Sequence, residues 1–271
     1  MRRVGADRIA LRGSEGELSV RVWEHTAPAR IVVLSHGYGE HIGRYEHVAG
    51  ALGERGAVVY GPDHLGHGES DGERVLVKDF ERIVDDLHSV VELARERHPG
   101  LPVVLVAHSM GGMIGARYAQ RHGDTLAGLV LSAPSIGVGP VLADWLLLPE
   151  LPDEPIDVSV LSREPGVGEA YAADPLVWHG GWKRPTVEAY VRFNETIEDG
   201  PGFDGLPVLY IHGEADALVP LALAQPAVER LAGEDFTEEI VPDARHETFN
   251  EFEREQTIGL VAGFAERVTA R

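Results

Sequence analysis

The residues best suited to covalent chemistry lie around Ser109, in the stretch LPVVLVAHSMGGMIG. An apolar run, Val103–Ala107, ends just before this serine, and Gly111 and Gly112 follow it where a helix-like pattern begins. A serine at a sharp strand-to-helix turn, flanked by small residues, forms a nucleophile elbow that exposes the hydroxyl group. Free N–H groups at the start of the helix stabilise an anion beside the serine. The stretch therefore predicts that Ser109 is a nucleophile, because a serine that only caps the helix needs no such small neighbours.

A nucleophilic serine needs a base to accept its proton and a carboxylate to orient that base. On an elbow of this kind the chain order is serine, acid, histidine. Asp216 follows the predicted strand Val208–His212, and His246 follows the predicted strand Thr237–Val241. Because the carboxyl ends of parallel strands meet at one edge of the sheet, both side chains should reach Ser109. The order and the placement predict a catalytic triad of Ser109, Asp216 and His246.

Some features around this triad leave alternatives open. Glu214 and Asp243 compete with Asp216 as the acid, and Glu214 is the more serious competitor. His212 also lies close to Asp216, but its position within a strand favours a structural role. Ala107 stands where the elbow motif usually has its first glycine, so the strand–helix crossing must accommodate one extra methyl group.

An oxyanion that develops on the substrate needs N–H donors beside the nucleophile. One donor is the residue after the serine, Met110, and the other comes from a loop after an early strand. Residues 36–39 of that loop read HGYG, and the glycines let the backbone come close to a substrate. We therefore expect the backbone N–H groups of Tyr38 and Met110 to form the oxyanion hole.

The elements that would position these residues alternate between strand and helix, which predicts an α/β fold with a parallel sheet covered on both faces. After a hairpin at Arg8–Arg12 and Glu17–Trp23, strands are expected at Ile31–Leu34, Ala57–Tyr60, Val103–Ala107, Leu126–Ser132, Val208–His212 and Thr237–Val241. Helices are expected at Tyr45–Arg55, Lys78–His98, Leu221–Leu231 and Glu251–Arg267. Between 136 and 205 the helical patches Val141–Leu148 and Val187–Thr196 lack strand partners. We therefore predict a core of residues 1–135 and 206–271, with a helical cap at 136–205.

Composition excludes several classes of protein. The formal net charge of −20 argues against binding to nucleic acid and against electrostatic docking on anionic lipid. The chain has no cysteine, which excludes disulfides and thiol catalysis. No apolar run approaches the ~20 residues of a membrane-spanning helix, and the first residues lack the apolar segment of a secretory signal. We expect a cytoplasmic protein that touches lipid surfaces only through apolar groups.

Metal and cofactor chemistry have little support in the sequence. His64 and His67 are spaced like metal ligands, but they lie in a glycine-rich turn with no helix to align the two rings. A phosphate-binding G-x-x-x-x-G-K-[ST] loop and a strand-associated G-x-G-x-x-G motif are both absent. We predict neither a metal nor a cofactor.

Several stretches of the chain resemble the monoacylglycerol lipases of the α/β-hydrolase fold. They are HGYGEHIGRYEHVAGAL, DHLGHGESDGERVLVKDF, HSMGG, PIDVSVLSREPGVGEAYAADPL, HGEADALVP and RHETFNE. The likeness runs from about Trp23 to the last helix, and the GEHIGRY and cap stretches are its most specific parts. The chain departs from the family at Ala107 and in a cap that is short before Leu151.

The resemblance implies a reaction and a binding pocket. Ser109 would attack the ester carbonyl of a monoacylglycerol and expel glycerol, and water would then release the fatty acid without any cofactor. The resemblance also implies that Glu40, Arg44 and Tyr171 hold the glycerol head. Taken alone, these residues equally suit a surface Glu–Arg pair beside a packing tyrosine.

The cap would supply the apolar surface that a lipid substrate requires. One side of its first expected helix is crowded with apolar residues, which are Val141, Leu142, Trp145, Leu146 and Leu148. Such a lid lines an acyl tunnel with one face and makes transient contact with a lipid surface with the other. The alternative is a lid packed wholly on the core, against which Leu147 argues because it widens the apolar stripe. Rival functions are a general carboxylesterase or lysophospholipase, and a non-catalytic binding protein, against which the predicted triad argues. The sequence indicates no oligomeric state.

Overall fold

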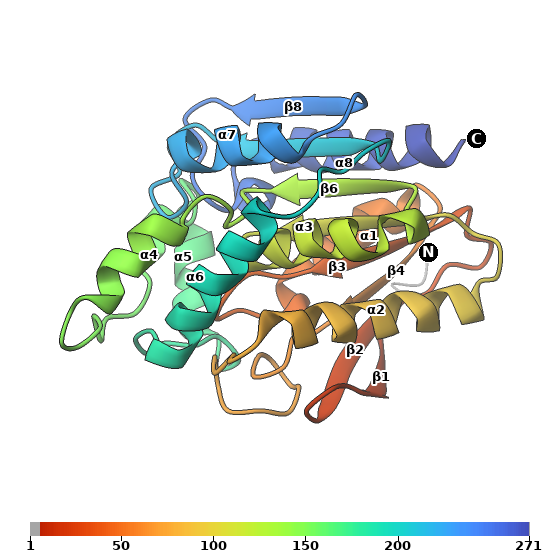
Figure 1. The fold of residues 1–271 in the computed structure, drawn as a ribbon. Helices are drawn as coiled ribbons and strands as arrows, with labels where there is room; N and C mark the ends of the chain where they lie inside the picture. The colour runs from red at the N-terminus through yellow and green to blue at the C-terminus, as the bar shows by residue number, and fades with distance from the viewer. Residues whose placement is uncertain (1–5, 271) are drawn as a thin grey trace.

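The computed structural model describes residues 6–270, which form one eight-stranded sheet with helices on both faces (Figure 1). The strands are β1 (Asp7–Arg12), β2 (Glu17–Trp23), β3 (Arg30–Ser35), β4 (Ala57–Pro62), β5 (Val103–His108), β6 (Gly128–Ser132), β7 (Val208–Gly213) and β8 (Phe236–Val241). Their order is β1-β2-β4-β3-β5-β6-β7-β8, with antiparallel pairing only where β2 meets β1 and β4. The predicted mostly parallel α/β sheet is confirmed. Residues 1–5 and 271 of the predicted core lie outside the described part.

Both faces of the sheet are apolar because successive residues of a strand point to opposite sides. In β3, Ile31 and Val33 belong to one core cluster, and Val32 and Leu34 belong to the other. The first cluster is covered by α2 (Phe80–Arg97), α3 (Met110–His122) and α7 (Leu221–Leu231), and the second by α1 (Glu46–Glu54) and α8 (Arg254–Thr269). Burial on both faces explains why the central strands are continuous apolar runs.

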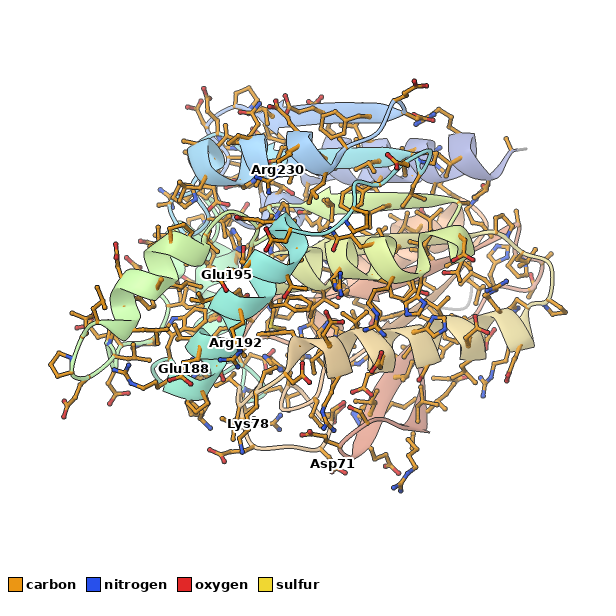
Figure 2. All side chains as sticks on the ribbon, in the orientation of Figure 1. Asp71, Lys78, Glu188, Arg192, Glu195 and Arg230 are labelled. Atoms are coloured by element: carbon orange, nitrogen blue, oxygen red, sulfur yellow. The ribbon has the colours of Figure 1, made fainter. Side chains whose placement is uncertain are left out.

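The chain leaves this alternation after β6 and resumes it at β7. Between these strands lie α4 (Gly139–Leu146), α5 (Pro165–Ala173) and α6 (Arg184–Glu198), with α6 packed against α4. Figure 2 places Glu188, Arg192 and Glu195 along α6, whose opposite face is buried. The helices α4 and α6 overlap the predicted helical patches. The sequence of α5, PGVGEAYAA, has no apolar stripe that would mark it as a helix.

Short 3-10 turns adjust the ends of several elements. They are η1 (Ile42–Tyr45), η2 (Gly123–Thr125), η3 (Val158–Val160) and η4 (Thr248–Asn250). The last helix begins at Arg254 and not at the expected Glu251, because Glu251 is fully buried and its carboxylate accepts hydrogen bonds from the backbone N–H groups of Arg163 and Arg245. Within residues 6–270, every helix is too short or too polar to cross a membrane.

Candidate active site

Ser109 lies at the turn from β5 into α3, where its backbone is strained. Its φ of 55° and ψ of −119° fall in a region that residues other than glycine rarely adopt. The turn is possible because its neighbours are small. A Cβ atom on Gly111 would lie 2.3 Å from the carbonyl oxygen of Ser35, and one on Gly112 would lie 2.7 Å from Cβ of Pro134. This crowding and strain are typical of a turn that presents a reactive side chain.

Ala107 fits in place of the usual glycine because another glycine faces it. A Cβ atom on Gly115 would lie only 2.8 Å from Cβ of Ala107. The methyl group of Ala107 therefore occupies space that Gly115 leaves empty on the facing helix. The strand and the helix can still cross closely, as an elbow requires.

Ser109, His246 and Asp216 form a continuous hydrogen-bonded chain. The Ser109 Oγ atom is 2.9 Å from Nε2 of His246, and Nδ1 of His246 is 2.7 Å from Oδ2 of Asp216. The second carboxylate oxygen, Oδ1, accepts hydrogen bonds from the backbone N–H groups of Leu218 and Val219, both at 2.9 Å. Because Nδ1–H of His246 donates to the carboxylate, its Nε2 atom is left to accept the serine proton.

Burial and charge together set the protonation of this pair. Burial alone would raise the pKa of Asp216, but the adjacent imidazoles of His246 and His212 outweigh it and hold the pKa below its usual value. Burial alone would lower the pKa of His246, but the carboxylates of Asp216 and Glu247 raise it above its usual value. The pair therefore combines an ionised carboxylate with an imidazole that readily takes up a proton.

The other acids that the sequence offered point elsewhere. Glu214 is exposed, and its carboxylate accepts a hydrogen bond from the backbone N–H of Asp243, which is also exposed, at 3.3 Å. His212 is buried behind Asp216, with Nε2 at 3.2 Å from the carboxylate and Nδ1 accepting from the Tyr210 hydroxyl at 2.7 Å. Of the acids considered, the structure brings Asp216 to the histidine.

The loop after β3 brings the backbone of Tyr38 beside the nucleophile. A Cβ atom on Gly37 would lie 3.2 Å from the serine Cβ atom. Glu40 holds this loop, because its Oε1 atom accepts hydrogen bonds from the Gly37 N–H at 2.6 Å and the Tyr45 hydroxyl at 2.7 Å. Within the described residues, the N–H groups of Tyr38 and Met110 have no protein acceptor. Both are therefore available to an oxyanion.

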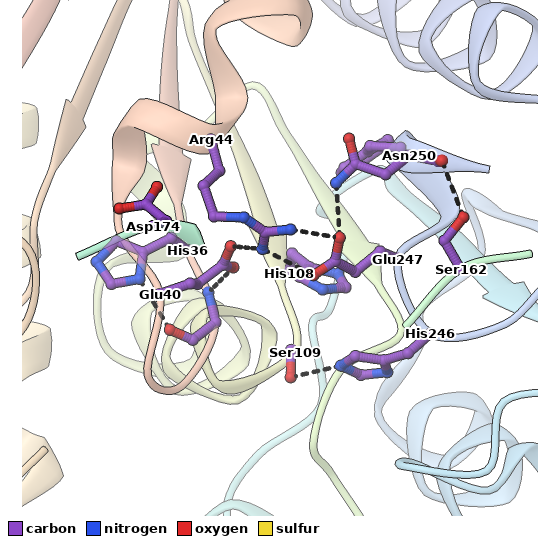
Figure 3. A network of polar contacts seen from close by, with 12 residues as sticks. His36, Glu40, Arg44, His108, Ser109, Ser162, Asp174, His246, Glu247 and Asn250 are labelled. Carbon is purple, nitrogen blue, oxygen red and sulfur yellow. Dashed lines mark hydrogen bonds and ion pairs between the residues drawn. The ribbon is translucent and has the colours of Figure 1, made fainter. Parts of the chain in front are cut away.

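Arg44 lies between two buried carboxylates, as Figure 3 shows. Its Nη1 atom donates to Glu40 at 2.5 Å, and Nη1 and Nη2 donate to the two oxygens of Glu247 at 2.7 and 2.8 Å. Burial would raise the pKa of Glu40, but Arg44 and two nearby histidines lower it to about 2. The guanidinium also lies over the ring of Tyr171, 4.8 Å from its centroid. The three expected glycerol-binding residues thus lie together, although Glu40 and Arg44 already bind each other.

The sequence alone does not single out Glu247, and its position directly after His246 is the only signal it carries. Asn250 supports its carboxylate with a hydrogen bond of 2.7 Å (Figure 3). Tyr171, in contrast, is 3% exposed and its hydroxyl has no partner within the described residues. This hydroxyl is therefore the group at the polar end of the site with unused hydrogen-bonding capacity.

A cavity of about 270 Å³ opens at Ser109. Its apolar end is lined largely from the inserted helices and their neighbours, by Val138, Leu142, Trp145, Trp182, Tyr190 and Leu223. Its other end carries Glu40, Tyr171 and Glu247. A cavity lined mainly by apolar side chains, with a few convergent polar groups, suits a small amphiphilic ligand.

The two histidines considered as metal ligands, His64 and His67, both pack beside His36. The ring of His36 lies 4.4 Å from that of His64 and 5.4 Å from that of His67, measured between centroids. His64 bonds the Ser35 hydroxyl through Nε2 at 2.9 Å, and burial holds its pKa well below the usual value. Within residues 6–270, no group of three or more acidic or histidine side chains is arranged to hold a metal ion.

Comparisons with known proteins agree with this arrangement. The model of the serine aminopeptidase S33 family matches residues 26–253. A monoacylglycerol lipase from Mycolicibacterium smegmatis is 39% identical over 253 residues, which cover 90% of each chain. The human monoglyceride lipase is 35% identical over 240 residues, covering 84% of this chain and 79% of that one. This chain belongs to the monoglyceride lipase-like family of α/β-hydrolases.

Solved structures of the family have the same fold. The monoacylglycerol lipase of Paleococcus ferrophilus superposes with a TM-score of 0.77 at 28% identity, covering 93% of this chain and 98% of that chain. A soluble variant of the monoglyceride lipase of Saccharomyces cerevisiae, solved with a substrate analogue, gives a TM-score of 0.84 at 19% identity, covering 97% and 96%. The predicted family, the α/β-hydrolase fold and the class of carboxylic-ester hydrolase are confirmed.

Proposed function

We propose that this chain hydrolyses monoacylglycerols to glycerol and free fatty acid through an acyl-enzyme. The observation that carries the proposal is the hydrogen-bonded chain of Ser109, His246 and Asp216, whose serine and histidine line a cavity with both apolar and polar side chains. The names of the relatives at 39% and 35% identity support this substrate.

The proposed reaction begins when Ser109 attacks the ester carbonyl while His246 takes the serine proton. Asp216 stabilises the imidazolium that forms, and the N–H groups of Tyr38 and Met110 bind the oxyanion of the tetrahedral intermediate. His246 then gives the proton to the departing glycerol oxygen. Water enters, loses a proton to His246 and attacks the acyl-enzyme, and collapse of the second intermediate returns the serine and releases the fatty acid.

We assign the two ends of the cavity to the two parts of the substrate. The acyl chain lies along the apolar end beneath α4 and α6, where burial of its methylene groups supplies binding energy. The glycerol head lies at the polar end, where the Tyr171 hydroxyl bonds a glycerol hydroxyl. Glu40 and Glu247 line this end of the cavity, and Arg44, which does not line it, holds both carboxylates in place.

We assign residues 136–205 as a cap that covers the site and touches lipid. At the end of α4, Leu147 is 82% exposed, and the nearby Val141 and Leu148 are 44% and 43% exposed. Apolar side chains at the tip of a cap can enter the surface of a lipid aggregate and so compensate for the acidic charge of the chain. The proposed location is the cytoplasm, with peripheral contact at lipid surfaces.

The test is a hydrolysis panel of a monoacylglycerol, a triacylglycerol, a lysophospholipid and a fatty-acid nitrophenyl ester. We expect the highest efficiency on the monoacylglycerol, because a second acyl chain would clash at the polar end. The Ser109→Ala variant should fold normally, lose fluorophosphonate labelling and lose about 10⁴–10⁶ in rate. Turnover of the nitrophenyl ester or lysophospholipid without monoacylglycerol hydrolysis would favour a general carboxylesterase or lysophospholipase instead.

A further inference from the structure

Tyr38, whose N–H is the expected oxyanion donor, needs a restraint on its side chain and on the backbone that follows it. It lies between Gly37 and Gly39, and Gly39 has a φ of 74°. Glycine on both sides gives a peptide more backbone freedom than other residues would. Glu40 holds the Gly37 N–H from the core, and Nδ1–H of His36 donates to the Gly37 carbonyl oxygen at 2.8 Å, but neither bond restrains the Tyr38 side chain or the Gly39 backbone. An oxyanion donor works only when it is held in place before the reaction begins.

A short segment of the cap, residues 178–182, contacts the side chain of Tyr38 and the backbone of the residue that follows it. The backbone N–H of Trp178 donates to the carbonyl oxygen of Gly39 at 2.7 Å. The ring of Trp182 stacks on the ring of Tyr38, with the centroids 4.0 Å apart and the planes 1° apart. Tyr38 is 8% exposed and its hydroxyl has no partner among residues 6–270. Ring packing, and not a hydrogen bond, therefore orients its side chain.

The segment is itself fixed to the rest of the cap. The Trp178 Nε1–H donates to the carbonyl oxygen of Gly181 at 3.0 Å, which closes the segment into a tight turn. Trp182 meets Trp145 of α4 and Tyr190 of α6 edge to face, at centroid distances of 5.9 and 5.8 Å. Trp182 thus connects both cap helices to the loop that carries the oxyanion donor.

We propose that Trp182 is a positioning residue for catalysis: its stack on Tyr38, with the hydrogen bond from Trp178 to Gly39, fixes the Tyr38 N–H where the oxyanion forms. Parallel aromatic rings at this distance attract each other beyond the contribution of buried area. A displacement of ~1 Å in a group that acts on the reacting atoms typically lowers the rate by about 10²-fold. The inference rests on the proposed ester hydrolysis and extends it from the core to the cap.

The experiment compares Trp182→Ala and Trp182→Phe with the native chain on nitrophenyl acetate, whose acyl group is too short to reach the apolar wall. We expect Trp182→Ala to lower kcat by at least about 10-fold with little change in KM. Binding of an alkyl trifluoromethyl ketone, which forms a tetrahedral oxyanion adduct, should weaken in parallel. Trp182→Phe keeps an aromatic ring in the stack, so it should keep most of the native kcat and most of the affinity for the trifluoromethyl ketone.

A control variant separates positioning from general loosening of the cap. Phe193 of α6 is 4% exposed, packs against Phe80 of α2 with centroids 5.3 Å apart, and is not among the described residues that line the cavity at Ser109. Phe193→Leu should lower the thermal stability but keep kcat on nitrophenyl acetate close to that of the native chain. If it lowers kcat as much as Trp182→Ala, the stack has no special role.

Two further results would overturn the inference. One is a folded Trp182→Ala variant with native kcat on the acetate and only a raised KM for long-chain esters, which would make Trp182 part of the acyl wall. If Trp182→Ala does not fold, Tyr38→Ala removes the same stack from the other side. A native kcat in the Tyr38→Ala variant would be the second result that overturns the inference. A native chain that hydrolyses no ester would instead contradict the proposed function.

Discussion

Both carboxylate oxygens of Glu247 accept hydrogen bonds from the guanidinium of Arg44, at 2.7 and 2.8 Å. Glu247 directly follows His246 in the chain, and the same guanidinium also donates to Glu40. Since Glu40 accepts a hydrogen bond from Gly37, one buried ion network joins the loop of the histidine to the loop of the oxyanion donor. Changes in this network should therefore alter both stability and catalysis.

Glu247→Gln should destabilise the fold. Glutamine keeps the shape of the side chain but leaves the buried Arg44 with a single carboxylate partner, and a buried charge that loses a partner destabilises by about 1–3 kcal/mol. Urea unfolding measures the loss. The exposed Glu214→Gln removes the same charge without a buried partner and should unfold close to the native chain. Equal effects of the two variants would contradict a structural role for the network.

The kcat/KM of ester hydrolysis should rise with pH through the titration of His246, because only the neutral imidazole accepts the serine proton. Asp216 and Glu247 raise the pKa of His246 despite its burial. The midpoint should therefore lie above the ordinary histidine value of about 6.5. Glu247→Gln removes one of the charges that raise this pKa, so it should move the midpoint to lower pH. An unchanged midpoint in that variant would show that Glu247 does not influence the titration of His246.

Asp216→Asn should lower kcat by about 10⁴-fold, because asparagine cannot hold the imidazole in the tautomer that accepts the serine proton. Burst kinetics with a nitrophenyl ester would show that acylation has slowed. Glu214→Gln is the matched comparison from the same loop. A large loss in Glu214→Gln with a normal Asp216→Asn would mean that Glu214 is the acid in solution.

Tyr171→Phe should reduce the preference for a glycerol ester. The hydroxyl of Tyr171 is buried without a partner among the described residues, and a hydrogen bond to glycerol contributes about 0.5–1.5 kcal/mol. The kcat/KM for a monoacylglycerol should therefore fall several-fold more than that for a nitrophenyl ester of the same acid. Tyr38→Phe removes an equally unpartnered hydroxyl elsewhere in the cavity and should not change this ratio. If the ratio of kcat/KM for the monoacylglycerol to that for the nitrophenyl ester were the same in both variants, Tyr171 would have no role in binding glycerol.

Gly115→Ala should destabilise the fold, because its new methyl group would lie 2.8 Å from that of Ala107. Overpacking of this kind typically costs about 1–3 kcal/mol in the free energy of unfolding. The double variant Ala107→Gly/Gly115→Ala moves the methyl group to the other side of the crossing and should recover most of the loss. If the effects of the two substitutions on the free energy of unfolding were additive, the side chains at 107 and 115 would not compete for one space.

The sequence was most informative where one local pattern implies one structure. Continuous apolar runs gave the central strands because a strand buried on both faces tolerates few polar residues. The spacing of Ser109, Asp216 and His246 relative to those strands then implied their convergence. These inferences need only the period of the pattern and the direction of parallel strands.

The sequence was least informative where the role of a residue depends on its partner. Glu247 lies in a loop among many acidic residues, and only the approach of Arg44 distinguishes it. The stack of Trp182 on Tyr38 joins residues far apart in the chain and has no local signature. The helix α5 is similar, because its Gly and Ala residues carry no apolar stripe and tertiary packing decides its form.

The network around Arg44 also gives the polar end of the cavity a net charge. Two buried carboxylates face one guanidinium there, so this end carries an excess of negative charge. A neutral glycerol head meets no repulsion, whereas a phosphate-bearing alcohol would lie close to two anions where water screens them poorly. The fatty acid product ionises as it forms and leaves into the field of a chain with a net charge of −20. We therefore expect the charge of the protein to speed the departure of its product and to weaken product inhibition.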